Sequence, residues 1–442
     1  MSTKEISPIK VGLIGLGTVG SGVVEILIHN ANEISRRSGR EIQVSLVCVK
    51  HIDKKRSIPS DDIKLVTDPF AVTNHADIDI ICELTDVVEL AREIVLSAIE
   101  NGKHVVTANK ALIALHGNEI FAAADSKGVM VAFEAAVAGG IPIIKVIREG
   151  LAANQIEWVA GIVNGTSNFI LTEMRDTGSE YLEILKEAKS LGYAEPDPTF
   201  DMEGIDAAHK FTILASIAFG IRLQFEKIYI EGINNIEQQD IAYVSELGYR
   251  IKHLGISRKT AKGLDLRVHP TLIPEHLNIA GVEGVMNALL VQTDVAGPMF
   301  YSGAGAGSKP TASSVVADIV DVVRVLTSDP ENRVPHLAFQ PDALSDIRIL
   351  SIEEVVTAYY LRMQMVNRPG ALADVFRILG NLEINIETIL QKESAATAAY
   401  IPVIILTQRV QEKKMKEAIS RIQTLESIGG DVIRIRLETL DG

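Results

Sequence analysis

The first third of the chain alternates short aliphatic runs with longer stretches whose apolar residues recur at helical spacing. Five runs have the length and composition of buried strands: IKVGLIGL, IQVSLVCV, IDIICEL, HVVTA and VMVAFEA. The stretches between them, such as VELAREIVLSAIENG, place apolar residues three and four positions apart. This alternation predicts an α/β domain over residues 1–140, in which a parallel, doubly wound (Rossmann) sheet carries helices on both faces.

The pattern changes over residues 141–310. Longer helical stretches (SEYLEILKEAKSLG, GIDAAHKFTILASIAFG and QQDIAYVSELGYRIKHLG) alternate there with strand-like runs (IEWVAGIV, LDLRVHPTLI and ALLVQTDVAGPMFY). We therefore expect an α+β or mixed-sheet second domain. The following segment, 311–335, begins with a strong helical pattern, and we expect that helix to pack back on the first domain.

The last part of the chain follows a predicted linker over 336–354, which holds Pro341 and few large apolar residues after Phe339. Residues 355–442 then give strand YYLRMQMV, helix ALADVFRILGN, strands INIETILQKE and AYIPVIILT, helix QEKKMKEAISRIQTLE and strand DVIRIRLE. This βαββαβ order predicts a ferredoxin-like domain.

The length and net charge of the chain indicate several domains and argue against some classes of binding partner. A chain of 442 residues is longer than one hydrophobic core normally supports, which agrees with several domains. The net charge of -14 argues against binding to nucleic acid or to anionic membrane. Cys48 and Cys82 lie in apolar runs, as expected for core residues in a reducing compartment. The N-terminus lacks the apolar region of a signal peptide, and no stretch has the length of a membrane span, so we expect a cytoplasmic protein.

The stretch KVGLIGLGTVGSGVVEIL places three glycines between a strand and a helix. Gly15 permits a tight turn, Gly17 lets the backbone approach a pyrophosphate, and Gly20 allows close packing of helix on strand. The strand before the motif and the helix after it are the context that a dinucleotide site requires.

The end of the second strand bears on the choice of cofactor. NAD binding usually places an acidic residue there, but this strand ends in Lys50 and His51, with Asp53 later and the cations Lys54, Lys55 and Arg56 beyond. Cations at this place favour NADP over NAD, although a solvated basic loop gives the same pattern.

The acid-rich stretch GYAEPDPTFDMEGIDAAHK places Asp206 and Lys210 four residues apart on one helix face. Taken alone, the pair is better explained as a surface ion pair. The apolar run KFTILASIAFG predicts instead that the helix is buried, and a buried pair suits a lysine that exchanges a proton with a reacting oxygen while the acid orients it. Lys110 follows a strand, where ligands collect in α/β sheets, but a solvated lysine at a helix start is an equally good reading.

Six motifs in order resemble homoserine dehydrogenase with a C-terminal ACT regulatory domain: GLGTVGSGVV, HVVTANKALIA, FEAAVAGGIPII, GIVNGTSNFIL, GYAEPDP followed by DAAHK, and YSGAGAGSKPTASSVVAD. The resemblance implies NAD(P)-dependent interconversion of L-homoserine and L-aspartate 4-semialdehyde, with residues 141–310 as the catalytic and dimerisation domain.

The resemblance implies a role for each matched position. Lys210 donates the proton, Glu195 and Asp206 contact the substrate, and Lys110 lies beside the nicotinamide and the substrate. The resemblance adds Thr18, Val19, Lys110, Gly192 and Gly307 as cofactor contacts. The glycine motif and the strand end argued above contribute the other residues expected to bind the cofactor, Gly15, Leu16, Gly17, Gly20 and Lys50. The backbone carbonyls expected to hold a monovalent cation, typically sodium, belong to Glu134, Val137, Gly139 and Ile141.

Two positions depart from the family pattern. Thr85 and Asp86 stand where a pair of glycines is expected after ICEL, which puts the detailed nicotinamide contacts in doubt. Lys50 and His51 stand where the family commonly has Arg-Asp, which leaves the cofactor choice open. The rival hypotheses are an amino-acid sensor with a decayed dehydrogenase core and a dehydrogenase of another small amino or hydroxy acid.

The turn VNRPGALADVFRIL resembles the start of an ACT domain, which implies feedback inhibition by an amino acid, threonine first, and domains that pair side by side in a homodimer or homotetramer. The candidate effector contacts are Asn367, Gly370, Leu372, Asn385 and Ile386. A dimerisation domain that binds no ligand is the alternative. We interpret His269 and His276 as surface residues and His209 as a residue on the flank of its helix.

Overall fold

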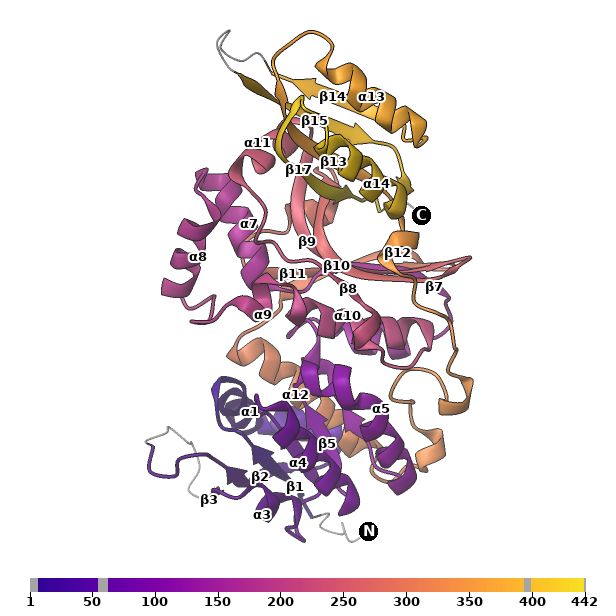
Figure 1. The fold of residues 1–442 in the computed structure, drawn as a ribbon. Helices are drawn as coiled ribbons and strands as arrows, with labels where there is room; N and C mark the ends of the chain where they lie inside the picture. The colour runs from indigo at the N-terminus through magenta and orange to yellow at the C-terminus, as the bar shows by residue number, and fades with distance from the viewer. Residues whose placement is uncertain (1–6, 55–62, 393–398, 441–442) are drawn as a thin grey trace. The chain divides into compact units, whose positions relative to one another are not determined.

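The computed structural model describes residues 7–54, 63–392 and 399–440. These residues form two compact units, each built from separate stretches of the chain (Figure 1). The first unit comprises Met1–Val159, Asp206–Glu226 and Met286–Ile347. The second comprises Ala160–Ile205, Lys227–Val285 and Arg348–Gly442.

The first unit contains a six-stranded sheet in which every pair of neighbouring strands is parallel. In spatial order its strands are β3 (Lys64–Val66), β2 (Ile42–Cys48), β1 (Ile9–Ile14), β4 (Ile80–Glu83), β5 (His104–Thr107) and β6 (Val131–Ala132). The order 3-2-1-4-5-6 is that of the doubly wound dinucleotide-binding fold. The predicted α/β class is confirmed.

Helices cover both faces of this sheet (Figure 1). They are α1 (Thr18–His29), α2 (Ala31–Ser38), α3 (Pro69–Thr73), α4 (Val88–Glu100), α5 (Lys110–Lys127) and α12 (Ser308–Val325). Helices α1 and α12 share one core cluster with the sheet, in which Val23 and Val24 of α1 accompany Val315 and Ile319 of α12. The long helix after residue 307 therefore packs on α1 within the same unit.

The first unit also holds a short helix α6 (Ile143–Lys145), the helix α10 (Ile205–Phe219) from its second residue onward, and the hairpin of β11 (Met286–Thr293) and β12 (Gly297–Ala304). Strand β7 (Ile156–Ile162) begins in this unit and ends in the other. The run ALLVQTDVAGPMFY, expected as one strand, forms this hairpin because Gly297, with φ of 75°, lets the chain reverse.

The second unit carries strands in the order β9-β10-β17-β13-β15-β14. Their bounds are β9 (Tyr249–Thr260), β10 (Gly263–Pro274), β17 (Ile428–Leu437), β13 (Val356–Val366), β15 (Tyr400–Thr407) and β14 (Ile386–Gln391), and β8 (Tyr229–Ile230) and β16 (Val410–Gln411) pair beside them. The helices of the unit are α7 (Gly165–Thr177), α8 (Tyr181–Ser190), α9 (Thr199–Met202), α11 (Gln238–Glu246), α13 (Ala371–Asn381) and α14 (Glu412–Gln423).

The C-terminal strands and helices have the predicted βαββαβ order, which is confirmed. Alternate residues of β13 face opposite sides of the sheet. Tyr359 and Leu361 join the core beneath α13 and α14, whereas Ala358 and Tyr360 join the core that holds α7, α8 and α11. Both faces of this part of the sheet are therefore covered within one unit.

Two further expectations from the sequence are wrong. The stretch QQDIAYVSELGYRIKHLG is one helix only as far as Glu246; Gly248, with φ of 79°, ends it, and β9 follows because it pairs with β10 over its whole length. The strand predicted for VMVAFEA is present but short, because only Val131–Ala132 form β6. His269 is buried, not exposed, because β10 lies inside the sheet, and its Nε2 lies 2.8 Å from Nη1 of Arg267. His276 is exposed, as expected.

None of the helices that the structure describes is long and apolar enough to cross a membrane.

Candidate active site

The helix α10 carries two of the predicted catalytic residues into the interior of the first unit. Asp206 lies in its first turn, where the N-terminal end of the helix dipole favours a carboxylate, and only 3% of the residue is exposed. Lys210 follows one turn later on the same face and is also buried. The helix is buried because nearly every residue after Asp206 is apolar or small.

A second lysine reaches the same carboxylate from another element. Lys110 is the first residue of α5, which follows β5 after Ala108 and Asn109, and its Nζ lies 2.8 Å from Oδ1 of Asp206. The Nζ of Lys210 lies 2.7 Å from Oδ2. The structure therefore brings together the three residues predicted to be catalytic, with one carboxylate between two ammonium groups. The reading of the Asp206–Lys210 pair as a surface ion pair is wrong.

The charges of this cluster decide its protonation. Burial by itself raises the pKa of Asp206, but the ammonium groups of Lys210 and Lys110 outweigh burial and hold that pKa well below its usual value. The carboxylate is therefore ionised at neutral pH. With both lysines protonated the cluster has a net positive charge, which suits it to stabilise an oxygen that becomes an alkoxide.

His209 lies beside this cluster but is inward-facing rather than on an exposed flank. It is 3% exposed and stacks on Phe225 with ring centroids 4.4 Å apart. Burial lowers its pKa to about 4, and Lys110 and Lys210 act in the same direction while Asp206 opposes them. His209 is therefore neutral near pH 7.

The neutral His209 predicts an acid-sensitive contribution to stability. The unfolded chain binds a proton on this imidazole below its ordinary pKa of about 6.5, whereas the folded chain stays neutral down to a pKa of about 4. The contribution is therefore present above that ordinary pKa and is lost as the pH falls towards 4. We expect the wild type to lose about 2 to 3 kcal/mol more free energy of unfolding than His209→Gln between about pH 7.5 and about pH 4.5. Urea denaturation of both proteins at the two pH values measures it, and equal losses would contradict it.

The glycine turn after β1 has the geometry that a pyrophosphate needs. Gly15 has φ of 100°, and a Cβ there would lie 2.5 Å from the carbonyl oxygen of Leu84. A Cβ at Gly20 would lie 2.1 Å from the carbonyl oxygen of Gly15. At Gly17, by contrast, a Cβ would meet no described atom within 4 Å, so the backbone there faces open space. Because α1 begins at this point, its N-terminus is a ready site for an anion.

The other predicted cofactor residues of the first unit flank this turn. Lys50 is exposed just after β2, and the N–H of Gly15 donates to the carbonyl of Cys48 on that strand at 3.1 Å. Gly307, with φ of 116°, precedes α12, and the hydroxyl of Ser308 donates to the carbonyl of Thr18 at 2.7 Å. Lys55 and Arg56 lie outside the described residues.

The acid-rich loop belongs to the second unit. Glu195 is exposed there, and Gly192 has φ of 75°. Two side chains at the start of α7 hold the loop: the amide of Asn164 donates to Asp201 at 2.8 Å, and the hydroxyl of Thr166 donates to the carbonyl of Tyr193 at 2.7 Å. Both residues lie in the motif GIVNGTSNFIL, but no role was predicted for either of them. An Asn directly before a helix is a typical N-cap, and this signal could have identified Asn164.

The segment with the predicted cation ligands is tightly turned. Ala138 and Gly139 have φ of 55° and 52°, and a Cβ at Gly139 would lie 2.5 Å from the carbonyl oxygen of Gly305. The carbonyl of Gly139 accepts from Ser314 at 2.7 Å, and that of Ile141 accepts from Ile143 at 2.8 Å. Each carbonyl oxygen has a second lone pair, so the donor set is compatible with a hard cation.

The candidate effector residues fall into two groups. Asn367, Gly370 and Leu372 follow the end of β13, where Val366 pairs with Tyr400. Asn385 and Ile386 lie at the start of β14, where Ile386 pairs with Thr407. The two ends of β15 are seven residues apart, roughly 24 Å along a strand. The five residues therefore do not meet within one chain.

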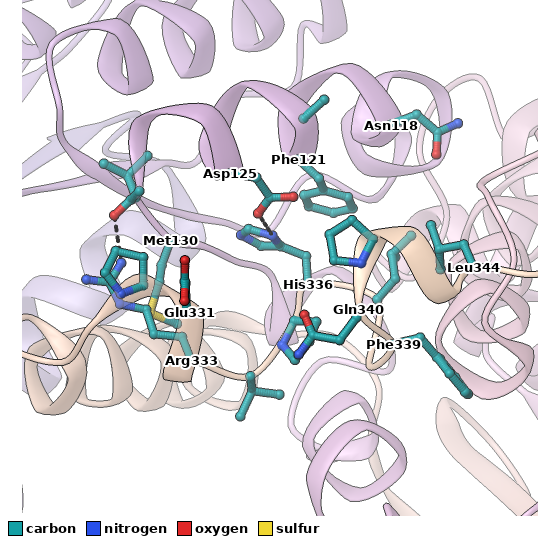
Figure 2. A pocket seen from close by; sticks show the side chains of 18 of the residues that line it. Asn118, Phe121, Asp125, Met130, Glu331, Arg333, His336, Phe339, Gln340 and Leu344 are labelled. Carbon is teal, nitrogen blue, oxygen red and sulfur yellow. Dashed lines mark hydrogen bonds and ion pairs between the residues drawn. The ribbon is translucent and has the colours of Figure 1, made fainter.

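A cavity of about 430 Å³ opens in the first unit between α5 and the segment after α12 (Figure 2). The ring of His336 stacks on Phe121, its Nδ1 lies 3.2 Å from Asp125, and its Nε2 accepts the N–H of Val131. None of the candidate site residues is among the described residues that line this cavity. We therefore do not identify it with the active site.

The chain matches three family models in succession. Residues 15–134 match the NAD-binding domain of homoserine dehydrogenase, residues 142–320 match homoserine dehydrogenase, and residues 359–423 match the ACT domain. A homoserine dehydrogenase of Pseudomonas aeruginosa is 59% identical over 99% of this chain and 100% of its own length.

Solved structures agree with these matches. A homoserine dehydrogenase from Thiobacillus denitrificans superposes with a TM-score of 0.94 at 59% identity, over 98% of this chain and 99% of that one. A hyperthermophilic archaeal homoserine dehydrogenase mutant in complex with NADPH superposes with a TM-score of 0.62 at 27% identity, over 72% of this chain and 98% of that one. The chain therefore belongs to the homoserine dehydrogenase family, with an NAD-binding domain towards its N-terminus and an ACT domain towards its C-terminus.

Proposed function

We propose that the chain interconverts L-homoserine and L-aspartate 4-semialdehyde, with Lys210 as the residue that exchanges a proton with the substrate oxygen. The observation that carries this proposal is the buried Asp206 carboxylate between the ammonium groups of Lys210 and Lys110, at 2.7 and 2.8 Å. Burying the two charges of the Asp206–Lys210 pair costs free energy, and stabilisation of a reacting oxygen beside the pair would account for that cost.

The roles follow from the charges. A bound nicotinamide would supply hydride to C4 of the aldehyde, or accept it in the oxidative direction. As charge develops on the substrate oxygen, the Lys210 ammonium stabilises it and then donates a proton to it. Asp206 stays ionised and holds both ammonium groups in place. Lys110 holds its charge on the nicotinamide side, and Glu195 accepts from the substrate ammonium.

The glycine turn fits a dinucleotide, and we propose NADP as the preferred form. The exposed Lys50 at the end of β2 supports it, since a cation there suits the 2′-phosphate. The NADPH complex of the archaeal relative is consistent with it. A monovalent cation, typically sodium, would bind the carbonyls of Glu134, Val137, Gly139 and Ile141, whose turned backbone supports this choice. The two free, buried cysteines agree with a cytoplasmic enzyme.

We propose threonine as the effector of the ACT domain and a homodimer or homotetramer as the assembly. The candidate contacts at the end of β13 and at the start of β14 lie at opposite ends of β15. If they form one site, they come from two copies of the chain whose domains pair side by side. Gly370, with φ of 86°, precedes α13, whose N-terminus would receive the carboxylate of the effector.

Steady-state kinetics tests the proposal. With purified chain and homoserine, we expect reduced nicotinamide to form, with a higher kcat/KM for NADP than for NAD, and threonine to lower the rate. If Glu195 binds the substrate ammonium, a homoserine analogue without its amine should have a kcat/KM far below that of homoserine. Folded protein that produces no reduced nicotinamide with either cofactor would contradict the function and favour an amino-acid sensor with a decayed core.

A further inference from the structure

A buried carboxylate outside the Lys110–Asp206–Lys210 cluster ties the sheet to the helix that carries Lys110. Glu83 ends β4 and has no exposed surface. Its Oε1 accepts both the backbone N–H of Thr85 at 2.7 Å and the hydroxyl of Thr85 at 2.6 Å. Its Oε2 accepts the hydroxyl of Thr107, at the end of β5, at 2.7 Å. Three donors thus compensate one buried acid, which costs far less than an uncompensated one.

Two routes lead from this carboxylate to the start of α5. Thr107 accepts the backbone N–H of Asn109 on its hydroxyl at 3.0 Å, and the carbonyl of Thr85 accepts the side-chain amide of Asn109 at 3.3 Å. Asn109 is the N-cap of α5, because its Oδ1 accepts the N–H of Leu112 at 3.0 Å. Lys110 is the next residue. The backbone position of Lys110 is therefore set by bonds that converge on Glu83.

We propose that Glu83 is a positioning residue for the reaction: through Thr85, Thr107 and the Asn109 cap it fixes the start of α5 and so holds the Lys110 ammonium on Asp206. This inference rests on the proposed function only where it predicts an effect of Glu83 on turnover. It also gives Thr85 a role at the position where the family pattern has glycine, since a glycine keeps the backbone donor but lacks the hydroxyl that donates to Oε1.

The hydrogen bonds to Glu83 could also have a purely structural role, in which they stabilise the ends of two strands without affecting Lys110. Burial raises the pKa of Glu83, and the bonds from Thr85 and Thr107 oppose that rise, as either role requires. An experiment that distinguishes the two roles must therefore measure the position of the Lys110 side chain itself. Lys127, on the same helix, is a matched internal reference: its side chain is 39% exposed with an ion pair at 2.8 Å, against 37% and 2.8 Å for Lys110.

The test uses the full chain without added nucleotide. Thr107→Val removes both bonds of the hydroxyl, Thr107→Ser restores them, and Glu83→Gln removes the charge. Thr73→Val is the matched control, because it deletes another fully buried hydroxyl of the same unit, one that bonds Phe70 and Ser97. Amine labelling by acetic anhydride, read by mass spectrometry, gives the rate at Lys110 relative to Lys127.

We expect Thr107→Val and Glu83→Gln to raise this ratio several-fold and to lower kcat by about tenfold to a hundredfold with little change in KM. Thr107→Ser and Thr73→Val should leave both quantities within about twofold of the wild type. An unchanged labelling ratio in both Thr107→Val and Glu83→Gln overturns the inference whatever the activity. A raised ratio with unchanged kcat supports the positioning and contradicts instead the role given to Lys110 in the proposed function.

Discussion

Replacing Lys210 with methionine should lower kcat by about three orders of magnitude, because general acid–base catalysis contributes about a hundredfold to ten-thousandfold and this residue also supplies electrostatic stabilisation. Methionine keeps much of the length and apolar volume of the lysine but has no proton to give. The fold should survive, since Asp206 keeps the Lys110 ammonium at 2.8 Å and is not left as an unpaired buried charge. Stopped-flow and steady-state rates in both directions give the change in kcat.

Lys127→Met is the matched control for this prediction. Lys127 lies at the end of α5, where it pairs with Glu100 at the surface, so its loss should leave kcat unchanged. Nucleotide binding, followed by the fluorescence of NADPH, should be the same in both variants and the wild type. A Lys210→Met enzyme with near-normal kcat would remove Lys210 from the reaction.

Replacing Gly20 with alanine should abolish measurable nucleotide binding, with at least about a hundredfold loss of affinity, and destabilise the first unit by about 1 to 3 kcal/mol. The added Cβ would lie 2.1 Å from the carbonyl oxygen of Gly15, and no side-chain rotation relieves this contact, because the Cβ is fixed by its own backbone and the oxygen belongs to the backbone. Either the turn or the start of α1 must move, and both are the groups that would face the pyrophosphate. NADPH titration and urea denaturation measure the two effects.

Gly17→Ala separates the two effects. A Cβ at Gly17 meets no described atom within 4 Å, so the unfolding free energy should change little. Affinity for NADPH should still fall, because the methyl group would occupy the space where the backbone approaches the pyrophosphate. A Gly20→Ala chain that binds NADPH like the wild type would show that the turn is not the nucleotide site.

Most of the fold was predictable from patterns within short stretches of the sequence. The alternation of aliphatic runs and helical stretches predicted the parallel sheet and the βαββαβ tail, because buried strands and amphipathic helices leave different periods. The pairing of Asp206 with Lys210 was also accessible, since both lie on one helix four residues apart. Burial of that pair followed from the apolar residues around it.

Features that depend on contacts between residues far apart in the sequence could not be predicted from local patterns. The meeting of Lys110 with Asp206 joins two elements far apart in the chain, and only a family resemblance indicated it. The carboxylate of Glu83 accepts hydrogen bonds from residues at or just after the ends of two strands, and no local sequence pattern predicts these bonds. His269 lies beside Pro270 and close to Pro274, which are residues typical of exposed turns, but β10 holds all three inside a sheet, so the predicted exposure of His269 is wrong. In each case tertiary pairing outweighed local preference.

The most direct test of the central claim is a crystal structure of the full chain with both NADP and homoserine bound. We expect the Nζ of Lys210 within about 3 Å of the substrate hydroxyl oxygen, with Asp206 still bonded to both lysines. A well-defined complex in which that ammonium contacts no oxygen of homoserine, while another side chain does, would contradict the assignment of the proton to Lys210.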